Sequence, residues 1–266
     1  MKRIAFTIMY NAAHHLRHCD FALKMISMFD HWIIAEGFAG NKGSTSWCNE
    51  LNCPIRSIDD TINLIGDYAD KQSECVRLVS PRKWESKDEM VNACIDIARD
   101  IIDGQDCFLW QVDADEHWTD DQLSRSEKSI IASCADTGMF LCNYFIGENL
   151  IVRGQWGEGL MTPYRRLWHW KGQRFASHEP PILSGGNGKE MLLQERFDHY
   201  AYFFEHDVKF KAMYYSGHEH VYRNWKKIQS GSVKFPAPIS TLFSGKMFSS
   251  TKSRIYQIKN HEKEAI

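Results

Sequence analysis

Residues 107–116 of this chain read CFLWQVDADE, an almost wholly apolar run followed directly by three acidic side chains. A short apolar run of this kind is typical of a strand that is buried on both faces of a parallel sheet. Asp113 and Asp115 are two residues apart, so in extended backbone their side chains point nearly the same way. The segment therefore predicts a buried strand with two carboxylates at its carboxyl end.

Strands and helices alternate in the sequence before this segment. Apolar runs at residues 2–9, 31–37 and 76–79 predict strands, and helical periodicity at about 13–29 and 87–102 predicts helices between them. This alternation indicates an α/β fold with a mostly parallel sheet flanked by helices. Ligands bind such sheets beyond the carboxyl ends of the strands, where Glu36 and the acidic cluster lie.

The pattern changes after about residue 120. A helix is expected at about 120–135, then strands at 138–146 and about 163–171, and then loops rich in aromatic residues and glycine. No repeat or linker marks a second domain. We therefore expect one domain over residues 1–220, with a nucleotide-sugar half (1–118) and an aromatic-rich acceptor half (119–220), followed by a basic C-terminal extension (221–266).

Composition restricts the class of protein. The 266 residues include 32 Lys plus Arg and 34 Asp plus Glu, a net charge of -2 that argues against broad affinity for nucleic acid. No apolar run reaches the roughly 18 residues of a membrane span, and the N-terminal run lacks the cleavage site of a signal peptide. The eight cysteines contain no CxxC pair and several lie in apolar runs, which favours reduced thiols and a cytoplasmic location.

The acidic cluster has little cationic company in the sequence around it. Converging carboxylates repel each other unless a divalent cation neutralises them, and oxygen ligands suit Mg²⁺ or Mn²⁺. A solvated acidic loop is the alternative for an isolated pair of aspartates. The buried strand in front of the pair, which follows several strand and helix units, favours a metal site.

Several segments together resemble the glycosyltransferases of the GT-A fold, in particular family 2-like enzymes with an Asp-Ala-Asp-Glu motif. Residues 108–118, FLWQVDADEHW, are similar to their DxD segment, and Ser177-His178-Glu179-Pro180 is similar to their His-Glu element. Asp198-His199-Tyr200 resembles their late His motif, and the helix from Lys87 resembles the one before the DxD segment. The likeness covers about residues 1–220, but Glu36-Gly37 stands where the family usually has Asp-Asp-Gly-Ser.

The resemblance implies a GT-A, Rossmann-like fold and a hexosyl- or pentosyltransferase. Such an enzyme moves a sugar from a nucleotide diphosphate sugar, UDP-linked here, to a hydroxyl of an acceptor glycan or other compound, with inversion. It implies that Asp115 binds Mn²⁺ or Mg²⁺ directly, while Asp113 contacts the ribose or a metal-bound water. His199 is the expected third metal ligand, although a structural histidine would fit the same pattern.

The resemblance also places the remaining site residues. Glu179 is the expected general base because the following prolines restrict its backbone; an exposed carboxylate paired with Arg174 is the alternative, and Glu116 is the rival base. Three further residues are expected to contact the donor: Glu36, Lys87 and Asn92. For Lys87, the alternative is that it is a solvated charge at the start of a helix, with no contact to the donor.

The acceptor side is less well defined by the sequence. The segment 154–159 and the pair Trp168 and Trp170 offer rings on which a sugar would stack, but core packing is slightly favoured, because residues 168 and 170 share one face of a strand. Arg165-Arg166 beside them would suit an anionic acceptor. The basic and aromatic run at 223–227 would suit a nucleic-acid acceptor, but a solvated face has the same composition, so this acceptor class is less favoured.

Two other enzyme classes use paired carboxylates and metal ions. A nucleotidyltransferase would carry a glycine-rich phosphate loop after the first strand, where Asn11 and Ala12 stand instead. A metal-dependent phosphohydrolase would carry an Asp or His at the same place. A carbohydrate-binding module would explain the aromatic residues but not the acidic pair after a buried strand.

Overall fold

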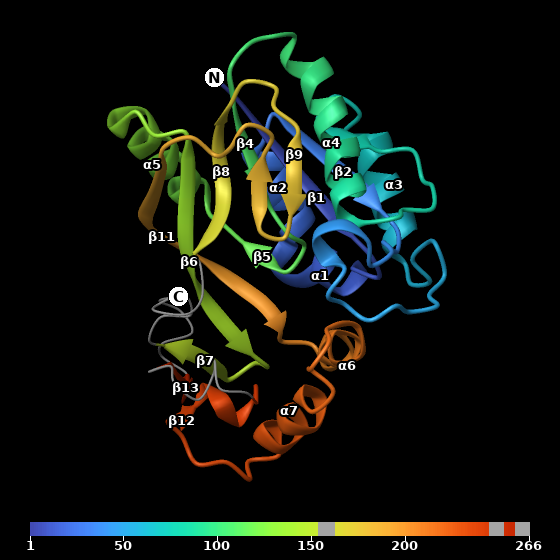
Figure 1. Ribbon diagram of the computed structural model, residues 1–266, viewed down its shortest axis with the longest axis vertical. Coiled ribbons are helices and arrows are strands. Elements are labelled where there is room, and N and C mark those ends of the chain that lie inside the picture. Colours follow the sequence, from blue (N-terminus) through green and yellow to red (C-terminus); the bar gives the residue numbers. More distant parts are fainter. Residues whose placement is uncertain (154–162, 245–252, 259–266) are drawn as a thin grey trace. The chain divides into compact units, whose positions relative to one another are not determined.

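The computed structural model describes residues 1–153, 163–244 and 253–258 (Figure 1). The chain forms two compact units, and each is assembled from two segments of sequence. Unit 1 comprises Met1–Met139 and Arg165–Glu195, and unit 2 comprises Phe140–Tyr164 and Arg196–Ile266. The expected boundaries at residues 118 and 220 stay a prediction.

Unit 1 contains the predicted mostly parallel sheet. Its strand order is β8-β4-β1-β2-β3. These strands are β1 (Lys2–Met9), β2 (His31–Glu36), β3 (Val76–Leu78), β4 (Cys107–Gln111) and β8 (Tyr164–Trp170). Strand β1 pairs in parallel with β2 and β4, β2 pairs in parallel with β3, and β8 runs antiparallel to β4. The carboxyl ends of β1, β2 and β4 therefore lie at one edge of the sheet.

Helices cover both faces of this sheet, as Figure 1 shows for α4. The helices of unit 1 are α1 (Ala13–Arg17), α2 (Phe21–Met28), α3 (Thr61–Lys71), α4 (Lys87–Ile102) and α5 (Asp120–Ser133), with short 3-10 turns η1 (His18–Asp20) and η2 (Gly43–Thr45). The expected helix at 13–29 is broken, because Cys19 and Asp20 adopt positive φ angles of 48° and 56°. The other helices predicted in this unit are confirmed.

The core of unit 1 follows from strand alternation. Ile4, Ile33 and Leu109 face α4 and pack with its apolar side. Residues one position along face the other way: Trp32 contacts Phe21 of α2. A hairpin of β9 (Phe175–His178) and β10 (Pro181–Leu183) packs on the α4 side, and the short β5 (Glu116–His117) follows the acidic loop.

The ends of the two main helices are set by local sequence. Ser86 caps α4 by accepting the Glu89 N–H at 3.1 Å, and Thr119 and Gln122 form a capping box at the start of α5. Because both caps are encoded within four residues, these helices begin where the sequence predicts.

The strands of unit 2 pair in the order β12-β13-β7-β6. Its elements are β6 (Thr137–Ile146, which begins in unit 1), β7 (Leu150–Arg153), β11 (Glu190–Tyr202, which also begins in unit 1), α6 (Glu205–Tyr214), α7 (Val221–Gln229), β12 (Ala237–Pro238), η3 (Ile239–Thr241) and β13 (Arg254–Gln257). Aromatic packing dominates this unit, as in the stacked rings of Phe145 and Tyr200. Within residues 1–153, 163–244 and 253–258, none of the helices is both long enough and apolar enough to cross a lipid bilayer.

Candidate functional site

The acidic cluster lies directly beyond the carboxyl end of β4, as expected. Strand β1 fixes its start, because the Thr7 hydroxyl donates to the Val112 carbonyl at 2.7 Å and the Val112 N–H donates to the Phe6 carbonyl. The side chain of Asp113 is 28% exposed and Asp115 is also partly exposed. Glu116, in contrast, is fully buried. Two of the three carboxylates are therefore accessible to a ligand.

Arg166 of β8 supplies a cation that the surrounding sequence does not reveal. Its guanidinium donates to both carboxylate oxygens of Glu116, at 2.6 to 3.0 Å, and to Oδ2 of Asp113 at 3.0 Å. The expectation that the cluster lacks a cation is therefore wrong. Because Glu116 is buried and held by this ion pair, its geometry does not suit the rival role of general base. The anionic-acceptor role for Arg166 is also not supported, since its side chain is only 5% exposed.

Glu179 lies at the turn between β9 and β10. Its Oε1 is 3.8 Å from Nζ of Lys87, and its Oε2 is buried without a hydrogen-bond partner. The alternative pairing with Arg174 is not observed, because Arg174 binds Asp96 at 2.8 Å. Glu179 thus has a partly buried carboxylate with one oxygen directed at a cation and the other unsatisfied.

His178, the last residue of β9, is buried and precedes Glu179. Burial lowers the pKa of His178, and the nearby positive charges of Lys87 and Arg166 lower it further, while Glu179 and Asp113 act in the opposite direction. All four of these charged side chains therefore act on the His178 ring. We call this group of Lys87, Asp113, Arg166, His178 and Glu179, together with Asp115 on the same loop, the acidic site. All of it belongs to unit 1.

The structure gives Glu36 and Asn92 clear contacts. Glu36 ends β2 and is buried; its Oε1 accepts the Ser57 N–H at 2.6 Å, and Arg56 lies 3.7 Å from its Oε2. The Asn92 side chain exchanges two hydrogen bonds with the backbone of Phe175, at 2.9 and 3.0 Å. Asn92 therefore ties α4 to β9. A donor contact for either residue stays a prediction.

His199 belongs to unit 2, whereas Asp113 and Asp115 belong to unit 1. The residue is 8% exposed, and its ring makes edge contacts with Tyr144 and Tyr164, at centroid distances of 5.0 and 5.5 Å. These contacts account for a buried histidine in an aromatic cluster. Its role as a metal ligand stays a prediction.

The residues of the acidic loop fit a divalent cation in part. Asp113 already accepts hydrogen bonds from Arg166 on Oδ2 and from Gln111 on Oδ1, so its orientation is fixed by protein groups. Asp115 follows on the same loop and is a partly exposed residue. Carboxylate oxygens are the donors that Mg²⁺ and Mn²⁺ prefer. The geometry therefore favours Asp115 as the ligand and Asp113 as an oriented neighbour.

The two tryptophans of β8 belong to the core. Trp168 and Trp170 are fully buried in the cluster beneath α4, so the favoured core-packing interpretation is confirmed and the alternative of stacking on a sugar is wrong. Arg165 binds Glu190 at 2.6 Å. The glycine-rich segment 154–159 lies outside the described residues.

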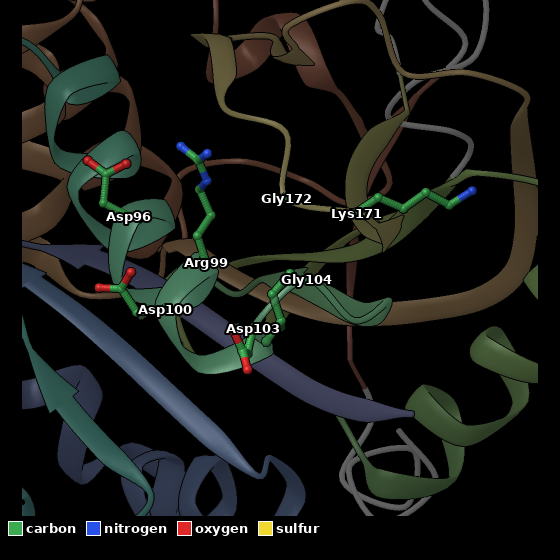
Figure 2. Close-up of a pocket in the computed structure, with 8 residues that line it drawn as sticks. Asp96, Arg99, Asp100, Asp103, Gly104, Lys171 and Gly172 are labelled. Atoms are coloured by element: carbon green, nitrogen blue, oxygen red, sulfur yellow. The ribbon is translucent and has the colours of Figure 1, made fainter.

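A hollow of about 550 Å³ lies at the far end of α4 from the acidic site. Figure 2 shows that Asp96 and Asp100 come from the last turns of the helix and that Lys171 points away from them. The acidic site borders the first turn of α4, at Lys87, whereas the hollow borders Asp103 and Gly104 at its end. The hollow is therefore separate from the carboxyl ends of β1, β2 and β4.

Sequence reasoning missed two residues that shape this site, Ser44 and Asp88. It also missed that Arg166 binds the acidic cluster. The main-chain N–H of His178 donates to Asp88 Oδ1 at 2.7 Å, and the N–H of Glu179 donates to Ser44 Oγ at 3.2 Å. Ser44 lies in a glycine- and serine-rich loop and Asp88 in the first turn of a helix, where both residue types are common. No signal in the sequence distinguishes them.

No protein-family model and no curated protein matches the chain. Among solved structures it is similar to S. aureus TarS, with 11% identity over 88% of this chain and 46% of that chain and a TM-score of 0.44. The shorter TarS 1-349 in complex with UDP-GlcNAc gives 13% identity over 80% and 66%, with a TM-score of 0.41. A 4-diphosphocytidyl-2C-methyl-D-erythritol synthase gives 14% over 64% and 76%, with a TM-score of 0.32. The chain spans about half the length of the full TarS chain, and none of these similarities is close enough to assign an activity.

Proposed function

We propose that the chain is a metal-dependent glycosyltransferase that transfers a hexose or pentose from a UDP-linked sugar to an acceptor hydroxyl, with inversion. One observation carries the proposal. Beyond the carboxyl end of the buried strand β4 lies a partly exposed carboxylate pair suited to a cation, and in the same unit the partly buried carboxylate of Glu179 lies 3.8 Å from Nζ of Lys87. The reaction requires one set of carboxylates that binds the cation at the diphosphate leaving group. It also requires a separate carboxylate that accepts the proton of the acceptor hydroxyl.

Each residue has a distinct task in this proposal. Asp115 would hold a divalent cation, which would supply Lewis acidity to the diphosphate. Lys87 adds positive charge at the same place, and Glu36 meets the nucleoside at the end of β2. Glu179 removes the proton from the acceptor hydroxyl as the oxygen forms its bond to the anomeric carbon. The bond from that carbon to the diphosphate breaks, and its electron pair leaves with the nucleoside diphosphate.

The residues at the end of β1 do not support the alternative that the chain is a nucleotidyltransferase. Asn11 N–H donates to Ser57 Oγ, and Asn11 Oδ1 accepts the Ile58 N–H. The turn after β1 is therefore bound to the loop at 57–58, and its sequence is not the glycine-rich run that cradles a triphosphate.

The first experiment identifies the donor. The melting temperature is measured with UDP-glucose, UDP-galactose, UDP-N-acetylglucosamine, CTP and ATP, each with Mn²⁺ and with EDTA. We expect a UDP-sugar to raise it in Mn²⁺ only, because a ligand that binds the native state stabilises it by mass action. Asp115→Ala should abolish the part of the rise in melting temperature that depends on Mn²⁺. A shift with CTP or ATP alone, or the same shift in EDTA, would contradict the proposal.

The second experiment tests the base. Glu179→Gln should keep the donor-induced melting shift and lower UDP release from the donor by about 10²- to 10⁴-fold, since the amide does not accept the proton. Glu85→Gln, a variant of an exposed glutamate in a surface pair with Lys42, is the matched control and should behave as the unchanged chain. Full activity of Glu179→Gln would remove Glu179 from the mechanism.

A further inference from the structure

Three segments that are distant in sequence meet behind Glu179. Asp88 Oδ2 accepts the Ser44 N–H at 2.7 Å, and Oδ1 accepts the Ser44 hydroxyl. The same Oδ1 accepts the His178 N–H at 2.7 Å. Ser44 Oγ in turn accepts the N–H groups of His178 and Glu179, at 3.3 and 3.2 Å. We call the two side chains the Ser44–Asp88 clamp.

The clamp is built on a rigid element. Asp88 lies in the first turn of α4, whose start is capped by Ser86 and whose apolar side is buried in the main core of unit 1. The carboxylate also suits the positive end of the helix dipole. Asp88 is therefore a fixed point to which both the 43–45 turn and the β9–β10 hairpin are attached.

The 43–45 turn is shaped to fit this point. Gly43 has a φ of 65°, and a Cβ at this position would collide with the Asp88 carboxylate. Only a glycine permits the backbone to pass so close to Asp88 with this φ. The close approach brings Ser44 Oγ within reach of two backbone N–H groups of the hairpin.

We infer that Ser44 and Asp88 are positioning residues for the general base, and this inference rests on the proposed function. The backbone N–H groups of His178 and Glu179 are both held by the clamp, and Asn92 fixes Phe175 at the start of the same strand. The direction in which the Glu179 side chain leaves the backbone is therefore set by Ser44 and Asp88. Neither clamp residue is assigned a contact with the donor.

The expected kinetic effect follows from this geometry. A displacement of about 1 Å at a reacting group lowers a rate by about 10²-fold. Ser44→Ala removes the acceptor of the Glu179 N–H, so it should lower kcat for UDP release by about 10- to 100-fold and leave the KM for the donor unchanged. Asp88→Asn should act in the same direction. Ser44→Thr keeps the hydroxyl and should restore most of the rate.

A double-mutant cycle separates positioning from a general structural effect. If Ser44 acts through Glu179, Ser44→Ala should cost nothing further in the Glu179→Gln background, because residues that act as a unit are not additive. Equal losses in both backgrounds would overturn the inference. So would an unchanged kcat for both Ser44→Ala and Asp88→Asn. Ser46→Ala and Asp96→Asn, which alter exposed neighbours on the same turn and helix, are the controls and should keep the original rate.

Two readouts keep this inference distinct from the proposed function. A rise in melting temperature with UDP and Mn²⁺ reports donor binding and does not depend on the general base. If the unaltered chain shows no such rise, the proposed function itself is rejected. A chain that binds UDP, loses activity in Glu179→Gln and keeps it in Ser44→Ala would retain the function and reject the clamp. Melting of each variant without ligand shows that the variant is folded.

Discussion

The ion pair of Arg166 with Glu116 provides the sharpest test of the site's architecture. Arg166→Met keeps most of the length of the side chain but removes the guanidinium that donates to Glu116 at 2.6 to 3.0 Å. Glu116 is fully buried, so the variant leaves a carboxylate without its counter-ion in the protein interior. We expect severe destabilisation for this reason.

The magnitude can be worked from these contacts. Removal of one partner of a buried ion pair costs about 3–5 kcal/mol, because the other charge stays buried and unpaired. At about 2–4 °C per kcal/mol for a protein of this size, the melting temperature should fall by roughly 6–20 °C. The double variant Arg166→Met/Glu116→Met removes both charges and should recover most of the loss, since apolar replacements of buried pairs are often neutral.

Thermal and urea unfolding followed by circular dichroism measure these differences. Arg174→Met is the matched control, because Arg174 and Asp96 form a pair in which both side chains are about half exposed. Such a pair contributes about 0–1 kcal/mol. A loss below about 1 kcal/mol for Arg166→Met, or a double variant no more stable than the single one, would refute the view that Arg166 neutralises the acidic loop.

Two further predictions concern buried titratable groups. Burial lowers the pKa of His117 to about 3, so protonation of this residue favours the unfolded chain. The contribution of neutral His117 to stability is fully present above the unfolded pKa of about 6.5 and is lost as the pH falls towards 3. The stability advantage of the chain over His117→Gln should therefore shrink by about 2.5 kcal/mol between pH 7 and pH 4.5, and a constant difference would contradict the assignment. Burial also raises the pKa of Cys94, and that of Cys107 to about 12, so maleimide at pH 7 should label the exposed Cys19 and Cys134 first. Rapid labelling of Cys94 or Cys107 in the native protein, read by peptide mass, would show that these thiols are not buried.

Much of the fold of unit 1 was predictable because its determinants are local. The strand at Cys107–Gln111 is apolar throughout, so it is recognisable as a strand buried on both faces. Helix α4 begins at Lys87 because its cap, Ser86, is the preceding residue. The broken helix near Cys19 was not predictable, since its apolar spacing continues through two residues with positive φ.

The sequence by itself determined the parallel α/β arrangement and the position of Asp113 and Asp115 at a strand end, because periodicity and burial are encoded in neighbouring residues. Only the tertiary structure decided what those carboxylates meet. Strand β8 runs antiparallel to β4, and Leu167 lies opposite Trp110. Arg166, the residue before Leu167, therefore lies beside the start of the acidic loop. The register of two strands more than fifty residues apart depends on the packing of the whole sheet. No local pattern records it, and the same is true of the meeting of Ser44, Asp88 and Glu179.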